Sequence, residues 1–425
     1  MSLALGVLPI GLLLLGFPIF LVLLTAVVVT LLLFMHTPLL VLHQTLFGAL
    51  NVYTLLAIPF FILTGELMGR GSVARRLVDL VNAGVGRMPG GLGVTTVCSS
   101  ALFGAMSGLS AASVATIGRA MLPALTAARY PAAFSAGLLT AMGAIDVVIP
   151  PSIPLLVYGT AAQQSVPRLY AAGIVPALML TAMLCGYVVW YCYRRGMGGG
   201  AEFALAGLGQ AALRGISALG APLIIFGGIY GGVFTPTEAA AVACVYAAGV
   251  PMLVYRELGW RDVLDCAEST AVFTGQILII VACAVLFGWA LTINQVPATL
   301  TRWLLGMHLP LWGLLLAINL LLLLVGSFMD GISAILLLTP LLVPLVTAFG
   351  VDPIHFGIIF VVNLGIGLFH PPFGINIFVA QTVLRLKLEL IYRGIIPFVG
   401  VYLVALALIT YVPWISIAGM RLLMN

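Results

Sequence analysis

Two stretches of the chain combine small residues with oxygen-bearing side chains, and each is followed later by a pair of adjacent prolines. The stretches are residues 104–113 and 326–331, and the proline pairs are Pro150-Pro151 and Pro371-Pro372. Proline lacks a backbone N–H donor and keeps the residue before it out of a helix, so carbonyl oxygens near each pair lose their partners. A hard cation such as Na⁺ binds such oxygens. The pattern therefore predicts two comparable cation sites, unless the prolines only kink helices within a bundle.

The composition indicates a protein that is embedded in a membrane. Of 425 residues, 63% are hydrophobic and 7% are charged, whereas charged residues make up about a quarter of a soluble domain. Seventeen basic and twelve acidic residues give a net charge of +5. No nucleic-acid-binding surface is indicated, because the chain carries no charge before Glu66. Six scattered cysteines without a C-x-x-C pattern indicate neither a disulfide framework nor a metal site.

Both oxygen-rich stretches lie in the middle of long apolar segments that we expect to enter the bilayer and return. Residues 89–125 are long enough to enter it, yet Arg87 precedes them and Arg119 and Arg129 lie at their other end. Both ends should therefore be on one face of the membrane. Residues 310–346 have the same form. The sequence thus predicts two re-entrant hairpins, each followed by a transmembrane helix that is broken at its proline pair.

One spacing relates these features across the two halves of the chain. Matching residues lie 221 apart at Pro89/Pro310, Leu102/Leu323, Pro123/Pro344, Thr126/Thr347, Ala127/Ala348, Pro150/Pro371 and Pro151/Pro372. Prolines coincide by chance less readily than leucines, so the spacing indicates an internal repeat. We expect five crossings between the hairpins. Because this number is odd, the first hairpin opens toward the cytoplasm and the second toward the outside, which inverts the second copy. Inverted repeats with interrupted helices are typical of secondary transporters, whose sites lie near the membrane midplane.

Basic residues set the expected orientation, because Lys and Arg are retained on the cytoplasmic side during insertion. We expect a basic loop at residues 70–87, a Gly-rich and Ala-rich link at 196–209, and an amphipathic surface helix at 256–268 to be cytoplasmic. The same side should hold Arg194, Arg195 and Arg214, and the basic residues at 385–393. The start of the chain lacks the basic residues of a cleavable signal peptide. We therefore expect the first apolar segment to be retained.

Four motifs give the chain a family resemblance. They are residues 57–66 (AIPFFILTGE), 149–154 (IPPSIP), 228–240 (GIYGGVFTPTEAA), and Phe328-Met329-Asp330 followed by Leu338-Thr339-Pro340. With these motifs, nearly the whole chain resembles the large membrane subunit of TRAP (tripartite ATP-independent periplasmic) transporters of the dicarboxylate and sialic acid type. Matching six elements per half splits the first apolar segment at Gly16-Phe17-Pro18 and puts the amino terminus outside.

The resemblance implies an all-α polytopic membrane protein of the ion transporter superfamily, with two inverted repeats and an elevator mechanism. It implies import of a small organic acid across the bacterial inner membrane, with Na⁺ as the coupling ion and no cofactor. It also implies a small four-helix membrane subunit and a periplasmic solute-binding protein as partners. We expect scaffold at residues 1–88, transport half 1 at 89–165, scaffold at 166–308, transport half 2 at 309–384, and one final helix at 385–425.

Carried over residue by residue, the resemblance places one Na⁺ site in each half and the substrate between the hairpin tips. The first site would use Ser107, Gly108 and Ser110, carbonyls near Ile149 and Pro150, and the hydroxyl of Ser152. The second would use Gly326, Ser327, Asp330, Pro371, Gly374 and Asn376. The residues expected to face substrate are Ser107, Gly108, Asp146, Ser152, Ser327, His370 and Asn376. A buried carboxylate such as Asp330 typically marks an ion path, although an aspartate before a helix can instead cap it.

Two residues beside the breaks depart from the family pattern. Asp146 stands where Gly is common, and His370 stands where Thr is common. Asp146 could bind a cationic group of a zwitterionic solute, His370 could orient a carboxylate, and either could titrate during transport. Alternatively, Asp146 lines a hydrated crevice and His370 bonds a free carbonyl. A proton-coupled transporter of a zwitterionic solute therefore remains the alternative to a Na⁺-coupled one.

Two other classes of protein fit the sequence less well. A channel would more naturally repeat one filter loop around an axis than oppose two unlike hairpins. An intramembrane enzyme is not indicated, because the chain has neither H-E-x-x-H nor G-x-S-x-G. It has no phosphate-binding loop of the Walker A type either, which leaves ion gradients as the source of energy.

Overall fold

The computed structural model describes residues 3–35, 38, 40–197 and 205–424, and within these ranges the chain is helical without a strand. The helices up to the middle of the chain are α1 (Leu8–Leu14), α2 (Ile19–Phe34), α3 (Leu40–Leu50), α4 (Ala57–Arg70), α5 (Val73–Val85), α6 (Gly91–Ser107), α7 (Ser110–Ala127), α8 (Ala132–Ala141), α9 (Ile153–Ala161) and α10 (Val166–Arg194). They are followed by α11 (Leu205–Tyr230), α12 (Pro236–Gly249), α13 (Trp260–Ile293), α14 (Val296–Gly306), α15 (Leu311–Phe328), α16 (Gly331–Ala348), α17 (Pro353–Gly367), α18 (Ile375–Thr382), α19 (Leu388–Tyr411) and α20 (Pro413–Leu423). Four short turns of other helix types are η1 (Leu3–Val7), η2 (Tyr53–Leu56), η3 (Met142–Ile145) and η4 (Val250–Val254).

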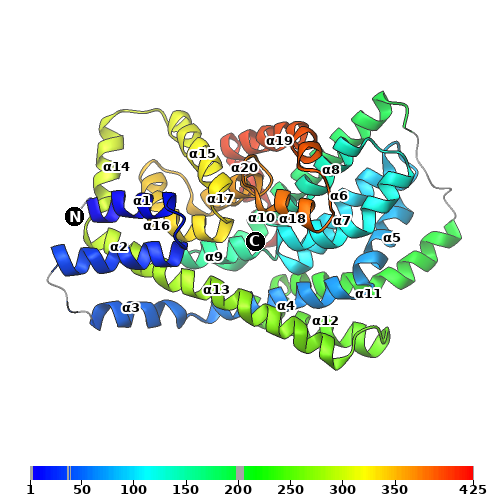
Figure 1. Cartoon of the computed structure of the whole chain (residues 1–425), viewed down its shortest axis with the longest axis horizontal. Helices are drawn as coiled ribbons and strands as arrows, with labels where there is room; N and C mark the ends of the chain where they lie inside the picture. Colours follow the sequence, from blue (N-terminus) through cyan, green and yellow to red (C-terminus); the bar gives the residue numbers. More distant parts are fainter. Residues whose placement is uncertain (1–2, 36–37, 39, 198–204, 425) are drawn as a thin grey trace.

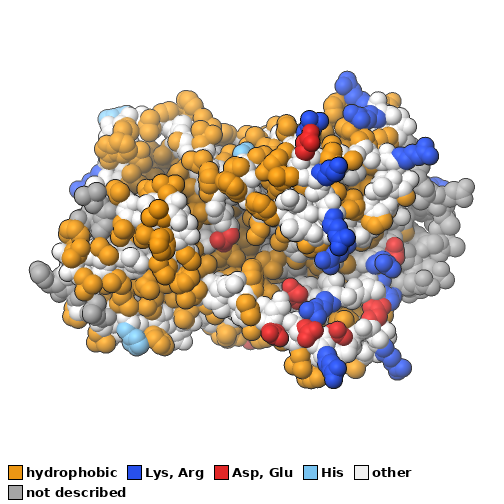
Figure 2. Space-filling view, in the orientation of Figure 1, with side chains coloured by type: hydrophobic (Ala, Val, Ile, Leu, Met, Phe, Trp, Pro, Cys, Tyr) orange, Lys and Arg blue, Asp and Glu red, His pale blue; other side chains and the backbone are white. Residues whose placement is uncertain are grey.

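The lengths and surfaces of these helices fit a multi-pass membrane protein. Among the described residues, six helices are long and apolar enough to cross a membrane, or seven if α3 and the segment Tyr53–Arg70, bent by 55°, form one span. On the face that Figure 2 shows, most of the visible Lys and Arg side chains lie in one half, whereas hydrophobic side chains dominate the other half. This separation is the pattern expected when one end of a membrane protein faces the cytoplasm.

Both predicted hairpins are present, with their turns at the predicted residues. Helices α6 and α7 meet at Gly108 and Leu109, where Gly108 has a positive φ of 61°. Helices α15 and α16 meet at Met329 and Asp330. In Figure 1 the first hairpin lies in the right half of the view and the second in the left half. Their tips meet between the two halves, because Gly108 and Asp330 line the same cavity.

Both predicted helix breaks are also present. After α8 and the turn η3, the chain loses regular structure until α9 begins at Ile153, and after α17 it does so until α18 begins at Ile375. The proline pairs lie inside these gaps. The breaks follow from proline chemistry, because each ring removes the N–H donor that a continuous helix would need.

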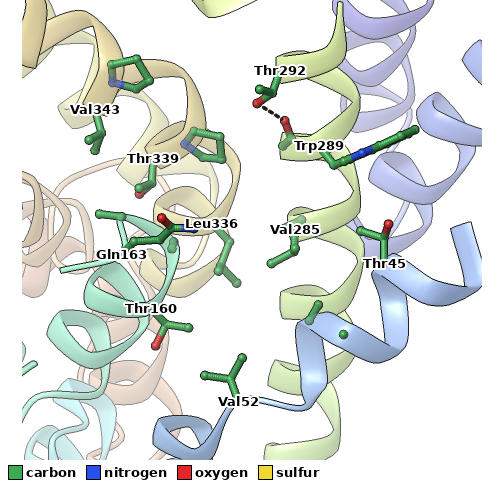
Figure 3. Close-up of a pocket in the computed structure, with 18 residues that line it drawn as sticks. Thr45, Val52, Thr160, Gln163, Val285, Trp289, Thr292, Leu336, Thr339 and Val343 are labelled. Atoms are coloured by element: carbon green, nitrogen blue, oxygen red, sulfur yellow. Dashed lines mark hydrogen bonds between the residues drawn. The ribbon is translucent and has the colours of Figure 1, made fainter. Parts of the chain in front are cut away.

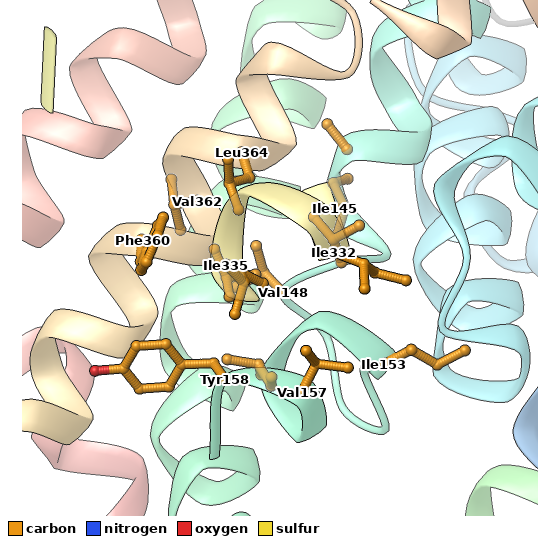
Figure 4. Packing of buried hydrophobic residues seen from close by; sticks show 14 of the residues in the cluster. Ile145, Val148, Ile153, Val157, Tyr158, Ile332, Ile335, Phe360, Val362 and Leu364 are labelled. Atoms are coloured by element: carbon orange, nitrogen blue, oxygen red, sulfur yellow. The ribbon is translucent and has the colours of Figure 1, made fainter. Parts of the chain in front are cut away.

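The two repeats share one hydrophobic core. Figure 4 shows buried side chains from the first break and α9 packed against side chains of α16 and α17, among them Ile145, Val157, Ile332 and Phe360. The Tyr158 hydroxyl of α9 also donates a hydrogen bond of 2.6 Å to the carbonyl of Pro353, at the start of α17. The elements around the two breaks are therefore joined across the repeats.

Helix starts follow local capping chemistry. Asp352 accepts hydrogen bonds from the backbone of Ile354 and His355, which satisfies donors that the first turn of α17 leaves free. Thr235 and Glu238 form a reciprocal capping box at the start of α12. Glu238 therefore serves as a helix cap.

Four sequence predictions need correction. The segment at residues 70–87 is not a loop, because Arg75 and Arg76 lie on α5. The segment at residues 256–268 does not form a separate surface helix: from Trp260 it continues without a break into the 34-residue α13. The last segment is two helices rather than one, because Pro413 begins α20. The link at residues 196–209 falls partly on 198–204, outside the described residues, and α11 already begins at Leu205.

The segment that precedes α13 is tied to the start of α5. Glu257 accepts hydrogen bonds from the backbone and hydroxyl of Ser72 and pairs with Arg76 at 3.2 Å. Partial burial opposes ionisation of Glu257, but these partners outweigh it and hold the pKa of the carboxyl below its ordinary value.

The split of the first apolar segment at Gly16 is confirmed. The five domain boundaries and the membrane orientation of the termini stay predictions.

Candidate ion and solute site

The tip of the first hairpin packs directly against the first break. A Cβ added at Gly108 would lie 2.9 Å from the carbonyl oxygen of Pro151 and 3.2 Å from the nitrogen of Ile153. A side chain has no room at this contact. The turn also requires a left-handed backbone conformation, which glycine adopts readily. The structure therefore brings Gly108 against Pro151 and Ile153 at the first break. Ser107 is buried beside them. That the carbonyls near Ile149 and Pro150 form an ion site with this tip stays a prediction.

The hydroxyl of Ser152 is engaged within its own segment. It donates to the carbonyl of Val147 and accepts from the backbone N–H of Leu155 at 3.2 Å, which caps α9. These two bonds use its donor and one acceptor position. Ser152 therefore shapes the break, and the structure does not present its hydroxyl to a solute.

The second hairpin meets the second break through Ser327 and His370. Ser327 donates to the carbonyl of Leu323 at 2.9 Å, and its oxygen lies 3.2 Å from Nδ1 of His370. His370 thus bonds a hydroxyl rather than the free carbonyl that was one of the two sequence interpretations. Gly326 lies against Gly367, where a Cβ added at Gly367 would be 2.6 Å from the carbonyl oxygen of Gly326.

Asp330 caps α16. Its carboxylate accepts hydrogen bonds from the backbone N–H and the hydroxyl of Ser333. The prediction that this carboxylate is buried is wrong, because Asp330 is exposed at the hairpin tip and lines a cavity there. Asp330 therefore both caps α16 and forms part of the wall of that cavity.

Asn376 belongs with the first hairpin rather than with the second site. Its side-chain amide donates to the Ser110 hydroxyl at 2.7 Å and to the carbonyl of Thr140 at 3.2 Å, and all of these groups are buried. The sequence assigned Asn376 to the second site because it follows the second proline pair. In the structure, the segment after the second proline pair packs against the first hairpin, so Asn376 supplies its side chain to the tip of that hairpin.

A cavity of about 220 Å³ lies where the two hairpin tips approach one another. Gly108 and Ser110 line it from the first tip, and Asp330 and Gly331 from the second. Its remaining wall comes from the break segments and from one face of α13. The other lining residues are Leu109, Ala111, Val147, Pro154, Phe273, Gln276, Ile277, Ile280, Ile332, Val361, Leu364, Gly365, Leu368 and Ile375. The predicted position of a solute, between the two tips, thus coincides with a cavity.

Most predicted substrate residues lie behind this cavity rather than in it. Gly108 lines it, whereas Ser107, Asp146, Ser152, Ser327, His370 and Asn376 are absent from its lining. Sequence reasoning missed Gln276, which is the one side-chain amide within residues 272–293. An isolated polar residue in a membrane helix was the available signal for it.

A second, larger cavity of about 700 Å³ follows the first along α13. Figure 3 shows Val285 and Thr292 of α13 across from Leu336 and Thr339 of α16, with Gln163 beside the α16 residues. The ring of Trp289 points to the other side of α13, where Thr45 lies. The first cavity touches α13 from Phe273 to Ile280, and the second touches it from Ala284 to Thr292. One helix therefore borders both hollows.

Comparison with known proteins adds the deciding observation. Residues 7–415 match the family model described as "Tripartite ATP-independent periplasmic transporter, DctM component". The chain belongs to this DctM family. It is therefore a transporter permease and a multi-pass protein of the inner membrane.

The DctM chain is similar to several curated permeases. It is 41% identical over 371 residues to an isethionate TRAP transporter permease protein of Oleidesulfovibrio alaskensis. The aligned region covers 87% of this chain and 58% of that protein. The chain is 40% identical over 373 residues to a C4-dicarboxylate TRAP transporter large permease protein of Pseudomonas aeruginosa, covering 88% and 87%. The chain thus spans under two thirds of the isethionate relative and most of the dicarboxylate one.

A solved transporter shares the fold of this DctM chain. The crystal structure of the YdaH transporter of Alcanivorax borkumensis matches with a TM-score of 0.59 and 17% identity, covering 88% of this chain and 87% of that one. At this identity the match supports the fold only. It agrees with an all-α polytopic transporter.

Proposed function

We propose that this chain imports a small organic anion with Na⁺ by an elevator movement of the two hairpins and their breaks. The observation that carries the proposal is the cavity of about 220 Å³ that both hairpin tips and α13 enclose. A solute in this cavity would touch elements of both repeats at once. Curated relatives act on isethionate and on C4-dicarboxylates, both of which are small organic anions.

Oxygen atoms at the two tips support Na⁺ as the coupling ion. On the first side these are the hydroxyls of Ser107 and Ser110, the amide oxygen of Asn376 and backbone carbonyls around Ile149 and Pro150. On the second side they are Ser327, the carboxylate of Asp330, and backbone carbonyls of Gly326, Pro371 and Gly374. Interrupted helices in a membrane persist only against protein or a hydrated cavity, and such breaks hold coupling ions in secondary transporters.

The contacts along α13 support a sliding movement. Phe273, Ile277 and Ile280 present an apolar face to the hairpins, and such a face can shift without breaking hydrogen bonds. The Tyr158–Pro353 and Ser110–Asn376 bonds join the two repeats, so the hairpins and breaks would move as one body. The crevice of about 700 Å³ farther along α13 leaves space next to the same helix.

Two further components fit the family description. The word tripartite, and the name large permease protein given to a relative, imply a smaller membrane subunit and a third component. We propose that these are a small four-helix membrane subunit, which enlarges the scaffold, and a periplasmic binding protein, which delivers the solute. Exposed hydrophobic side chains on α2 and α3, including Leu32, Leu33, Leu40 and Phe47, are available to lipid or to the smaller subunit.

Replacing Asp330 tests the second ion site. Asp330→Asn keeps a side chain that caps helices well, whereas Asp330→Ala removes the cap and costs about 1 kcal/mol of stability. We expect both variants to need about tenfold more Na⁺ for half-maximal uptake, because both remove a charged ligand worth about 1.5 kcal/mol or more. The measurement is Na⁺-driven uptake of radiolabelled succinate and isethionate by the reconstituted complex with its binding protein, alongside thermal unfolding.

Asp352 supplies the matched control, because it caps α17 by the same kind of bond. Asp352→Ala should lower the unfolding temperature as Asp330→Ala does, and leave the Na⁺ dependence unchanged. If Asp330→Asn transports with the Na⁺ dependence of the wild type, Asp330 is only a cap. If wild-type uptake of both solutes ignores the Na⁺ gradient, the proposed coupling is wrong.

A further inference from the structure

Asp146 carries a carboxyl group that its surroundings leave only partly hydrogen-bonded. The side chain is completely buried. Oδ1 accepts a hydrogen bond of 3.3 Å from the Ser100 hydroxyl, while Oδ2 has no hydrogen-bond partner among the described residues. The ion pairs that the described residues form do not include Asp146. An ionised carboxylate in such a position is strongly unfavourable unless a cation or a proton neutralises it.

Among the residues that the structure describes, no positively charged side chain pairs with Asp146. From α7 the hydroxyl of Ser113 faces the carboxyl group, and from α19 the ionisable side chain that interacts with it is Tyr402. The Tyr402 hydroxyl donates to the carbonyl of Ala141. Helices α10 and α17 approach the same segment through Gly173 and Gly365. Neutralisation must therefore come from a bound ion or a proton.

The space around the carboxyl group favours a proton. A Cβ added at Gly104 on α6 would lie 2.5 Å from Oδ1 of Asp146 and 2.6 Å from its Cγ. The carboxyl group is thus pressed against the backbone of the first hairpin. A metal ion with its shell of ligands needs room at this contact, whereas a proton needs none.

The internal repeat shows that this carboxyl group is not needed to build the fold. Gly367 lies 221 residues after Asp146 and packs against Gly326 of the second hairpin through backbone alone. The same contact between a break and a hairpin therefore forms without a side chain in the second half. In the first half, the carboxyl group of Asp146 lies at this contact.

We propose that Asp146 binds a proton, and that this proton holds η3 against the first hairpin. This inference rests on the proposed function, because the same turn carries Gly143, where a Cβ would lie 2.7 Å from the carbonyl oxygen of Ser110 in the proposed first Na⁺ site. When the carboxyl group releases its proton, the buried charge is unpaired. Separation of η3 from α6 then admits water and loosens the ion site. Protonation of Asp146 thereby controls Na⁺ retention at the first tip.

Infrared difference spectroscopy of the reconstituted membrane complex tests the proton directly. At neutral pH we expect a carbonyl stretching band of a protonated carboxyl group, which disappears as the pH is raised. The band should be absent from Asp146→Asn and from Asp146→Gly, which copies the arrangement at Gly367. Asp352→Asn is the control and should keep the band, because Asp352 is a helix cap at the start of α17. Thermal unfolding identifies which variants are folded.

The outcomes separate this inference from the proposed function. The proton site would be overturned if the wild-type spectrum at neutral pH contained no band that the Asp146 variants lack. Loss of the band when Na⁺ replaces K⁺ at fixed pH would also overturn it, because the carboxylate would then bind the metal ion. In uptake assays, Na⁺-driven transport by the wild type should fall about tenfold per pH unit once Asp146 ionises, and the variants should lack this fall. Failure of all Na⁺-driven uptake would refute the proposed function. The infrared spectrum would still show whether Asp146 binds a proton.

Discussion

Gly108→Ala is expected to abolish Na⁺-driven uptake while the protein still assembles in the membrane. Alanine at this position is strained by about 1–2 kcal/mol, because φ is 61°. In addition, its Cβ would lie 2.9 Å from the carbonyl oxygen of Pro151, so the hairpin tip and the first break must move apart. A displacement of ~1 Å among ligating groups costs about a hundredfold in function. The measurement is solute uptake per folded complex at saturating Na⁺.

Gly350→Ala separates backbone strain from the contact with the break. Gly350 also has a positive φ, of 83°, but a Cβ there would meet nothing within 4 Å. This control should lose about 1 kcal/mol of stability and keep most of its transport activity. Equal losses of uptake in the two variants, or normal uptake by Gly108→Ala, would show that the tip does not need its close approach to Pro151.

The features that the sequence predicts well are those encoded locally. Adjacent prolines break a helix wherever they occur, and residues 104–113 form a turn because small residues bracket Gly108. The spacing of 221 residues then links the two halves without any structural knowledge. Hairpins and breaks are therefore predictable from one sequence.

Features that depend on contacts between distant residues cannot be predicted from one sequence in this way. Ser110 and Asn376 lie 266 positions apart, and their bond depends on how the two repeats dock, which no local pattern contains. The exposure of Asp330 and the burial of Asp146 likewise depend on which elements cover each side chain. The single helix α13 was missed for a different reason, because its charged first turns mimic a surface helix although nothing between Glu268 and Val272 ends it.

The bond between Ser110 and Asn376 makes the second large prediction, because it connects the hairpin of one repeat to the break of the other. Asn376→Ala leaves Ser110 and the carbonyl of Thr140 without this partner in a fully buried setting. Each unsatisfied buried group costs about 1–3 kcal/mol. We expect the loss to appear as about a hundredfold weaker Na⁺ activation of uptake, because the amide oxygen and the Ser110 hydroxyl are proposed ion ligands.

A double-mutant cycle and a matched asparagine make this prediction decisive. Ser110→Ala combined with Asn376→Ala should lose less Na⁺ activation than the two single losses added together, since residues that share one hydrogen bond are not additive. Asn363→Ala removes an equally buried amide that donates to Asn319 and Ile359. It should lower the unfolding temperature to a similar extent and leave the Na⁺ dependence intact. If Asn363→Ala and Asn376→Ala shift Na⁺ activation equally, the Ser110–Asn376 bond only stabilises the fold, and the first ion site must be sought elsewhere on the hairpin.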